Sequence, residues 1–176
     1  MFLTGTGVSD DHSGGGWKTS IRNFYTYAWA PDTSEGSLIA ALRAGRCFFG
    51  DVLRFTGQLD LLVDGVAPMG SVTVSSLATR TLRITATNVP SGGRVNVVRG
   101  PADLAGPSQP EPATVVTTMP ASAFAAGPVD VSVTPGAGCF IRTEVSDATG
   151  LIIAGSNPVW LLPDPSSVLI PPERSL

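Results

Sequence analysis

The sequence predicts a mainly β protein, built as a β-sandwich of immunoglobulin-like general shape. Short runs of alternating apolar and polar residues recur from about residue 53 to residue 162, with turn signals between them. Only 14% of the residues are charged, and the 20 glycines and 15 prolines favour short strands over long helices. The chain lacks the Cys…Trp…Cys pattern of antibody-type domains, so the sequence predicts only the general architecture.

A strand and a helix are predicted ahead of the sandwich. The aromatic, uncharged run 24–30 is typical of a buried strand, and a proline-containing turn follows it at 31–33. Thr33 or Ser34 can cap a helix whose first turn holds Glu35, a favourable charge at that end. The helix itself is indicated by Leu38, Ile39 and Leu42 on one face, Arg43 in the last turn and Gly45 just beyond it.

Period-two alternation marks the individual strands of the sandwich. Leu59, Leu61 and Val63 occupy alternate positions ahead of Asp64-Gly65, a dipeptide that is typical of hairpin turns. Further strands are predicted at 72–74, 81–87, 94–98, 114–118, 129–133, 141–145, 151–154 and 159–162. Several short antiparallel strands at this spacing favour two packed sheets.

The only histidine of the chain lies in the run Ser9-Asp10-Asp11-His12, which glycine-rich stretches flank on both sides. An Asp-x-His pair offers one oxygen and one imidazole ligand, and an extended backbone directs both to the same side. This donor set suits Zn²⁺, Mn²⁺ or Fe²⁺ better than Ca²⁺. Two ligands do not close a site, because a catalytic zinc takes about three protein ligands plus water. A solvated polar loop is the alternative interpretation of the run.

Several segments match one family in the same order. The first set is Gly7-Val8-Ser9-Asp10-Asp11-His12-Ser13, then Trp17, then Thr26-Tyr27-Ala28-Trp29, then the helix end at 37–46. A second set follows at 140–145, 147–150 and 154–161. The first set resembles the end of a PHP domain, of the polymerase and histidinol phosphatase superfamily of metal-dependent phosphoesterases. The similarity is to the branch of carbaryl-type carbamate and ester hydrolases, and the second set is similar to the C-terminal β-domain of that branch.

The resemblance implies a function and a set of site residues. It assigns metal-ligand roles to Asp10 and His12, with Asp11 as an outer-shell or substrate contact. Independently of the resemblance, Trp17 is a candidate pocket residue because it follows three glycines beside the motif, and the Arg46 guanidinium could contact a phosphate, although a structural role at the helix end is favoured for Arg46. The intact enzyme would bind a divalent transition metal, Zn, Mn or Fe, and hydrolyse a small-molecule ester or phosphoester. The family assigns no catalytic residue to this chain beyond these ligands.

The resemblance also predicts how the chain is organised. Residues 1–51 would be the C-terminal segment of the PHP barrel, a strand and helix remnant, residues 52–162 the β-sandwich, and residues 163–176 a Pro- and Ser-rich tail. PHP sites also use a His-x-His pair near the start of the domain, which a chain with one histidine cannot contain. We therefore expect the C-terminal part of a longer hydrolase, inactive alone, whose partner is the missing N-terminal barrel region. A non-catalytic β-sandwich binding module with a barrel remnant is the alternative.

Bulk properties limit the other partners. The net charge is −3, without a cluster of Lys or Arg, which disfavours nucleic acid. No run reaches the ~18 apolar residues of a membrane helix and no signal-peptide pattern is visible, so we expect a soluble chain without membrane contact. The mean hydropathy of +0.24 predicts apolar surface that the barrel would cover. Cys47 and Cys139 are expected to be buried free thiols, and unpaired strand edges would allow a homo-oligomer.

Overall fold

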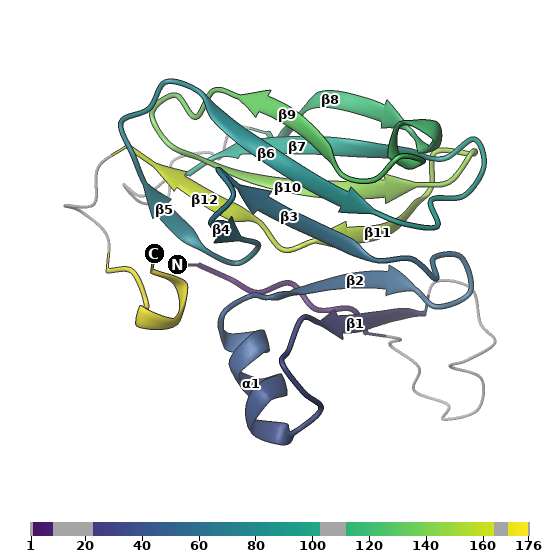
Figure 1. The fold of residues 1–176 in the computed structure, drawn as a ribbon, viewed down its shortest axis with the longest axis horizontal. Helices are drawn as coiled ribbons and strands as arrows, with labels where there is room; N and C mark the ends of the chain where they lie inside the picture. The colour runs from purple at the N-terminus through teal and green to yellow at the C-terminus, as the bar shows by residue number, and fades with distance from the viewer. Residues whose placement is uncertain (1, 9–22, 103–111, 164–168, 176) are drawn as a thin grey trace.

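Two β-sheets make up most of the fold in the computed structural model, which describes residues 2–8, 23–102, 112–163 and 169–175 (Figure 1). The prediction of a mainly β protein is confirmed. The smaller sheet has the order β4-β3-β6-β9, with β3 at Leu59–Val63, β4 at Ala67–Pro68, β6 at Arg80–Ala86 and β9 at Val129–Val133. The larger sheet contains β1 (Phe24–Ala28), β2 (Cys47–Asp51), β5 (Val72–Val74), β7 (Arg94–Pro101), β8 (Thr114–Pro120), β10 (Cys139–Ser146), β11 (Ile152–Ser156) and β12 (Val159–Leu162).

The larger sheet forks beside β10. One edge of β10 pairs along its whole length with β7, which in turn pairs with β8. The other edge pairs with β12 in its first half and with β11 in its second half. From there β12 continues to β5 in parallel, while β11 continues to β2 and β1. The two branches diverge at Asn157 and Pro158, the two residues between β11 and β12.

The core lies between the two sheets and follows the predicted alternation. Leu59, Leu61 and Val63 of β3 are fully buried, as are Leu82 and Ile84 of β6. The larger sheet contributes Val95, Val97, Ile141, Val145, Ile153 and Leu161 to the same cluster. Because a strand turns alternate side chains to opposite faces, this alternation fixes which face of each sheet is buried.

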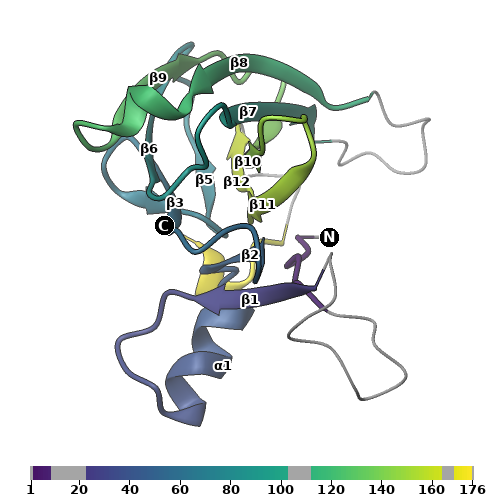
Figure 2. The same ribbon diagram turned by 90° about the vertical axis from the view of Figure 1, so that its right-hand side faces the viewer.

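The predicted N-terminal helix is present as α1, Glu35–Arg43, and its caps are as expected. The Ser34 hydroxyl accepts a hydrogen bond from the Ser37 amide at 3.3 Å, and Gly45 follows the helix with a φ of +69°. The apolar face is not buried, however. Leu38, Ile39 and Leu42 are 38%, 40% and 36% exposed, and only Ala41 of the helix is buried. The helix projects below β1 in two perpendicular views (Figure 1, Figure 2).

The strands that flank α1 belong to the larger sheet. β1 pairs antiparallel with β2, and β2 pairs with β11 of the sandwich. Strands from both sides of the predicted domain boundary, between residues 51 and 52, therefore belong to one hydrogen-bonded sheet. The predicted strand and helix exist, and their origin in a PHP barrel stays a prediction.

One strand at the edge of the larger sheet is interrupted by a bulge. In the described part of the chain β8 pairs only with β7, and the register shifts between Val97 and Val98 of β7. Val97 pairs with Thr117 and Val98 with Val115, so Val116 is an extra residue in β8. Val115 and Val116 are 55% and 46% exposed.

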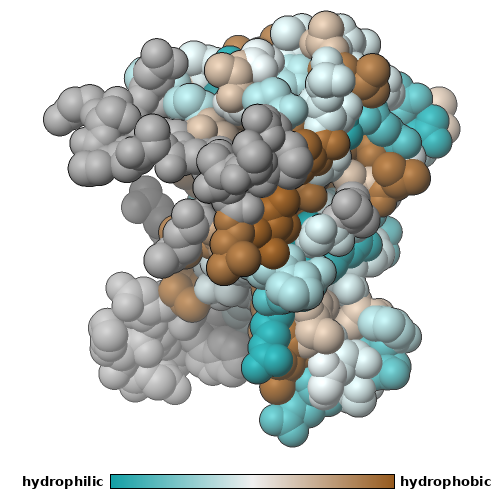
Figure 3. Space-filling view, turned by 90° about the vertical axis from the view of Figure 1, so that its left-hand side faces the viewer, coloured by the Kyte–Doolittle hydropathy of each residue, from teal (hydrophilic) through white to brown (hydrophobic). Residues whose placement is uncertain are grey.

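Hydrophobic side chains also reach the surface of the larger sheet. Seen from the side on which β5 and the N-terminal end lie, they gather in one patch at the middle of the molecule (Figure 3). On the outer face of this sheet the ring of Trp160 meets those of Phe2 and Phe140, with centroids 5.2 Å and 5.5 Å away. Aromatic rings on an outer sheet face are unusual in a surface that contacts only water.

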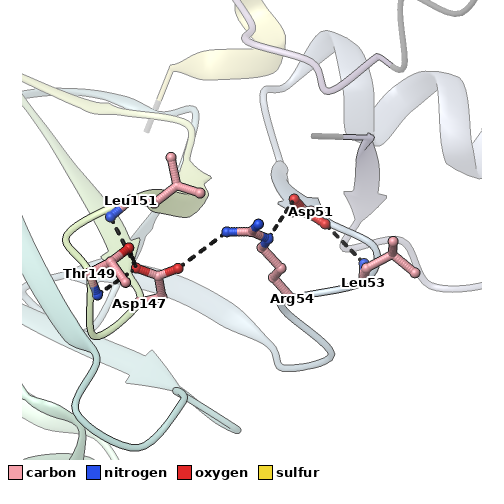
Figure 4. A network of polar contacts seen from close by, with 6 residues as sticks. All are labelled: Asp51, Leu53, Arg54, Asp147, Thr149 and Leu151. Atoms are coloured by element: carbon pink, nitrogen blue, oxygen red, sulfur yellow. Dashed lines mark hydrogen bonds and ion pairs between the residues drawn. The ribbon is translucent and has the colours of Figure 1, made fainter. Parts of the chain in front are cut away.

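A polar network joins two connections at one end of the sandwich (Figure 4). The guanidinium of Arg54, just after β2, lies 3.3 Å from a carboxylate oxygen of Asp147 and 3.8 Å from one of Asp51. The other oxygen of Asp147 accepts hydrogen bonds of 2.6–3.1 Å from Thr149 and the Leu151 amide. The hydrogen bond from the Thr149 hydroxyl is the main cause that holds the pKa of Asp147 below its ordinary value.

We predict that Leu61→Ala lowers the free energy of unfolding by about 2–5 kcal/mol, because it leaves a cavity between the sheets. Leu77→Ala is the matched control, since Leu77 is 60% exposed, and it should change stability by about 0.5 kcal/mol or less. Urea unfolding followed by circular dichroism measures both. Equal losses in the two variants would contradict the assigned core.

A second prediction concerns acid stability. A depressed pKa for Asp147 stabilises the fold above the ordinary carboxyl pKa, and this contribution is lost as pH falls through the lower folded value. Thr149→Val removes the hydroxyl that is the main cause of the lowered Asp147 pKa. The urea midpoint of the wild type should therefore exceed that of the variant at pH 7, and this difference in midpoint should disappear as the pH falls toward 3. Thr114→Val, at an exposed position of β8, is the control and should show no pH-dependent gap.

Candidate functional site

The Asp-x-His motif lies outside the described residues, as do its neighbours Asp11 and Trp17. The geometry of Asp10 and His12 is therefore still a prediction. Among the residues that the structure does describe, no group of three or more His, Cys, Asp or Glu side chains could hold a metal ion. The candidate site is therefore defined by the residues that hold the two ends of the segment containing the motif.

Arg46 is the one predicted site residue that the structure describes. It lies just before β2, where its carbonyl accepts a hydrogen bond from the Trp29 amide at 2.8 Å. Its guanidinium is 4.0 Å from the carboxylate of Asp60 on β3, a contact that links α1 and β2 to the smaller sheet. Asn23, where the motif segment re-enters the described fold, lies at the opposite end of the β1–β2 ladder. Arg46 thus has a structural contact, and its predicted substrate role stays a prediction.

The residues that lead into the motif form a segment that we call the N-terminal strap, residues 2–8. The Thr4 hydroxyl donates to the carbonyl of Leu42 in α1 at 3.1 Å. The Gly7 amide donates to the Thr26 hydroxyl of β1 at 2.9 Å, and that hydroxyl donates back to the Gly7 carbonyl at 3.2 Å. A Cβ at Gly7 would lie 2.8 Å from the Tyr25 carbonyl oxygen, so only glycine fits this close approach.

The strap meets the sandwich at Asn157, the residue at the fork. Its side chain is 2% exposed. The amide nitrogen donates to the carbonyls of Gly5 and Cys47 at 3.0 Å and 2.7 Å, and the side-chain oxygen accepts from the Gly5 amide at 2.6 Å. The carboxamide therefore pairs with both backbone groups of Gly5, as a neighbouring strand would.

Cys47 lies beside this amide as a buried free thiol, and Cys139 is a second one, as the sequence predicted. The amide nitrogen of Asn157 is 3.1 Å from the Cys47 sulfur. Burial raises the pKa of both thiols, which keeps them neutral. A neutral, inaccessible thiol is a poor nucleophile, so neither cysteine is a candidate for covalent catalysis.

A second tether comes from the C-terminal tail, where η2 spans Pro172–Arg174. The Arg174 side chain is 5% exposed. It donates to the carbonyl of Arg43, the last residue of α1, at 3.1 Å, and it also contacts the hydroxyl of Thr4 in the strap. Burial lowers the pKa of Arg174, although a guanidinium stays charged in proteins. A cation at the carbonyl end of a helix is favourable, so this contact also caps α1.

A groove borders the strap on the outer face of the larger sheet and has a volume of about 450 Å³. Two aromatic rings of its wall lie over glycines of the neighbouring strands. Phe140 is paired with Gly100 and Phe49 with Gly155, where a Cβ would come within 2.2 Å and 2.6 Å of the rings. The groove is also lined by Leu3, Arg142, Glu144, Ile152, Asn157 and Trp160.

The charged groups of the groove are one cation and one carboxylate. Arg142 donates to one oxygen of Glu144 through two nitrogens, at 3.0 Å and 2.7 Å, and its guanidinium carbon is 5.7 Å from the centre of the Phe140 ring. This arrangement can hold an apolar or aromatic group beside a charge pair. It contains no activated nucleophile.

Sequence reasoning missed both tethering residues. Arg174 lies in a tail that was predicted only as a Pro- and Ser-rich segment. Asn157 had a usable signal, because an Asn-Pro pair between two apolar strand runs indicates a break in a sheet ladder. Trp160 is half-buried and lines the groove. Trp29 packs against the core, and its indole donates to the Leu59 carbonyl at 3.1 Å.

No helix in the described ranges is long and apolar enough to cross a membrane. No protein-family model matches the chain, and no significant match to it exists among curated proteins or solved structures.

Proposed function

We propose that this chain is the β-rich accessory part of a metal-dependent ester hydrolase, phosphoesterases included, and that Asp10 and His12 are two of its metal ligands. A bound Zn²⁺, Mn²⁺ or Fe²⁺ would activate a water molecule and polarise the scissile ester. The chain has a single histidine, so the remaining ligands would come from a barrel region outside this sequence. The chain alone is expected to be inactive.

The observation that most favours this function is that the motif segment is attached at both ends to the same strand. Gly7 is hydrogen-bonded to Thr26 of β1. At the other end, the Val52 amide donates to the carbonyl of Asn23, directly before β1, at 3.0 Å. Metal ligands must be held in place by the surrounding structure, because a loosely placed ligand adds little affinity.

The uncovered face of α1 supports the same proposal. Leu38, Ile39 and Leu42 lie together on a helix that buries only Ala41. In a complete fold such a face is normally turned toward other apolar surface. A barrel region packed against α1 would cover it, in agreement with the family resemblance of residues 37–46.

We predict that the purified chain binds one Zn²⁺ weakly, with a dissociation constant on the order of 1–100 µM, equivalent to about −8 to −5.5 kcal/mol. The Asp10→Ala/His12→Ala double variant should lose this binding. Elemental analysis and isothermal titration measure it, and EDTA should remove the metal. Nitrophenyl esters and phosphates should not be hydrolysed by the chain alone.

Glu35→Ala is the control for the loss of a carboxylate, since Glu35 is an exposed residue of α1, and it should bind zinc like the wild type. Equal zinc binding by the wild type and the double variant would contradict the ligand assignment. The gene offers a further check. An in-frame His-x-His motif upstream of Met1 would favour the hydrolase, whereas a ribosome-binding site directly before Met1 would favour a separate module.

A second candidate function is a non-catalytic binding module, and the groove is the observation that favours it. Its volume of about 450 Å³ lies in the range of small-molecule sites, and its wall is largely apolar with few polar groups. In this function the Asp-x-His run would be a solvated loop, and the groove beside the strap would bind the ligand.

If the groove binds small aromatic molecules, the fluorescence of 8-anilinonaphthalene-1-sulfonate should rise several-fold on addition of the chain. Phe140→Ala removes one wall and should reduce this enhancement strongly. Val115→Ala is the control, because Val115 is exposed on β8 and is not among the residues that line the groove. Equal enhancement by both variants would place the dye elsewhere and count against the groove.

A further inference from the structure

Asn157 connects three parts of the fold that are distant in sequence. It lies at the fork between β11 and β12, and its side chain bonds to Gly5 of the strap and to Cys47 of β2. We propose that Asn157 is the positioning residue that fixes the N-terminal strap on the sandwich and thereby places the Asp10–His12 motif. The metal part of this inference rests on the proposed function, whereas the attachment of the strap does not.

The chemistry of the position favours a carboxamide over other side chains. Gly5 presents a donor and an acceptor to the side chain, and Cys47 presents a second acceptor. An aspartate would lose the donor and place its charge against two carbonyl oxygens. An alanine would leave the amide and the carbonyl of Gly5 without this partner, whereas the Cys47 carbonyl would keep its hydrogen bond from the backbone amide of residue 157 at 3.3 Å. Because the side chain is 2% exposed, water replaces these hydrogen bonds poorly.

Fixing Gly5 and Gly7 restricts the motif that follows. Asp10 is three positions after Gly7, and a chain of that length spans at most about 10 Å. Thr26 holds Gly7 from β1, and Arg174 and Leu42 hold Thr4 from the tail and α1. Among these contacts, those of Asn157 attach the strap to the fork between β11 and β12.

A single cleavage tests the attachment. Lys18 is the only lysine of the chain, so a lysine-specific endoproteinase cuts once and separates residues 1–18 covalently from the rest. In the wild type the fragment should stay bound through the tethers, and gel filtration with mass spectrometry should recover it with the large fragment. In Asn157→Asp the fragment should dissociate, with a dissociation constant at least tenfold higher.

Asn96→Asp is the matched control. Asn96 lies on β7 and accepts a hydrogen bond from Thr118 at 2.8 Å, without contact to the strap. This variant should retain the fragment like the wild type. Asn157→Ala serves as a second variant in case Asn157→Asp fails to fold, which circular dichroism would show before cleavage. Retention of the fragment by a folded Asn157 variant, or its loss from the wild type, would overturn the proposal.

Zinc titration of the uncleaved chains tests the positioning role. Asn157→Asp should weaken Zn²⁺ binding at least tenfold at a temperature well below unfolding, and Asn96→Asp should not change it. Unchanged zinc affinity in Asn157→Asp would overturn the positioning role. If the wild type binds no zinc, the proposed function fails and the positioning of a metal ligand fails with it. The cleavage experiment still decides in that case whether Asn157 holds the strap.

Discussion

The buried carboxamide of Asn157 is the contact on which the join between the strap, β2 and the fork depends. Where β11 and β12 separate, the ladder of backbone hydrogen bonds is interrupted, and Pro158 offers no amide hydrogen to continue it. The Asn157 side chain pairs instead with Gly5 and Cys47. One buried side chain therefore supplies hydrogen bonds where three segments converge, beside the backbone hydrogen bond from the Asn157 amide to the Cys47 carbonyl at 3.3 Å.

The two ends of the described chain meet at the end of α1. Thr4 and Arg174 both reach carbonyls of its last turn, at Leu42 and Arg43. The helix is thus held by hydrogen bonds at its C-terminal end while its apolar face is exposed. Such a helix is well placed to present a fixed apolar surface, because its position does not depend on burying that surface within this chain.

The sequence predicts most of the fold, because strand alternation and helix capping are local signals. Leu59, Leu61 and Val63 are buried, as their alternation indicated. Ser34 caps the start of the helix and Gly45 follows its last turn, as their residue types indicated. The tethers were not predicted, since Asn157 and Gly5 are 152 positions apart. Their contact is set by the path of the whole sheet. The predicted metal ligands lie outside the described residues, so the part of the site that can be examined is its attachment.

The extra residue Val116 bears on how the protein behaves at high concentration. β8 is an edge strand without charged side chains, and its exposed valines would suit pairing with a strand of another molecule. Many β proteins prevent such edge-to-edge growth with lysines, and the one lysine of this chain, Lys18, is far from β8 in sequence. The bulge instead offsets the outward amide and carbonyl groups from the spacing of a regular strand. Any protection of this edge against pairing with another molecule would therefore come from backbone geometry rather than from charge.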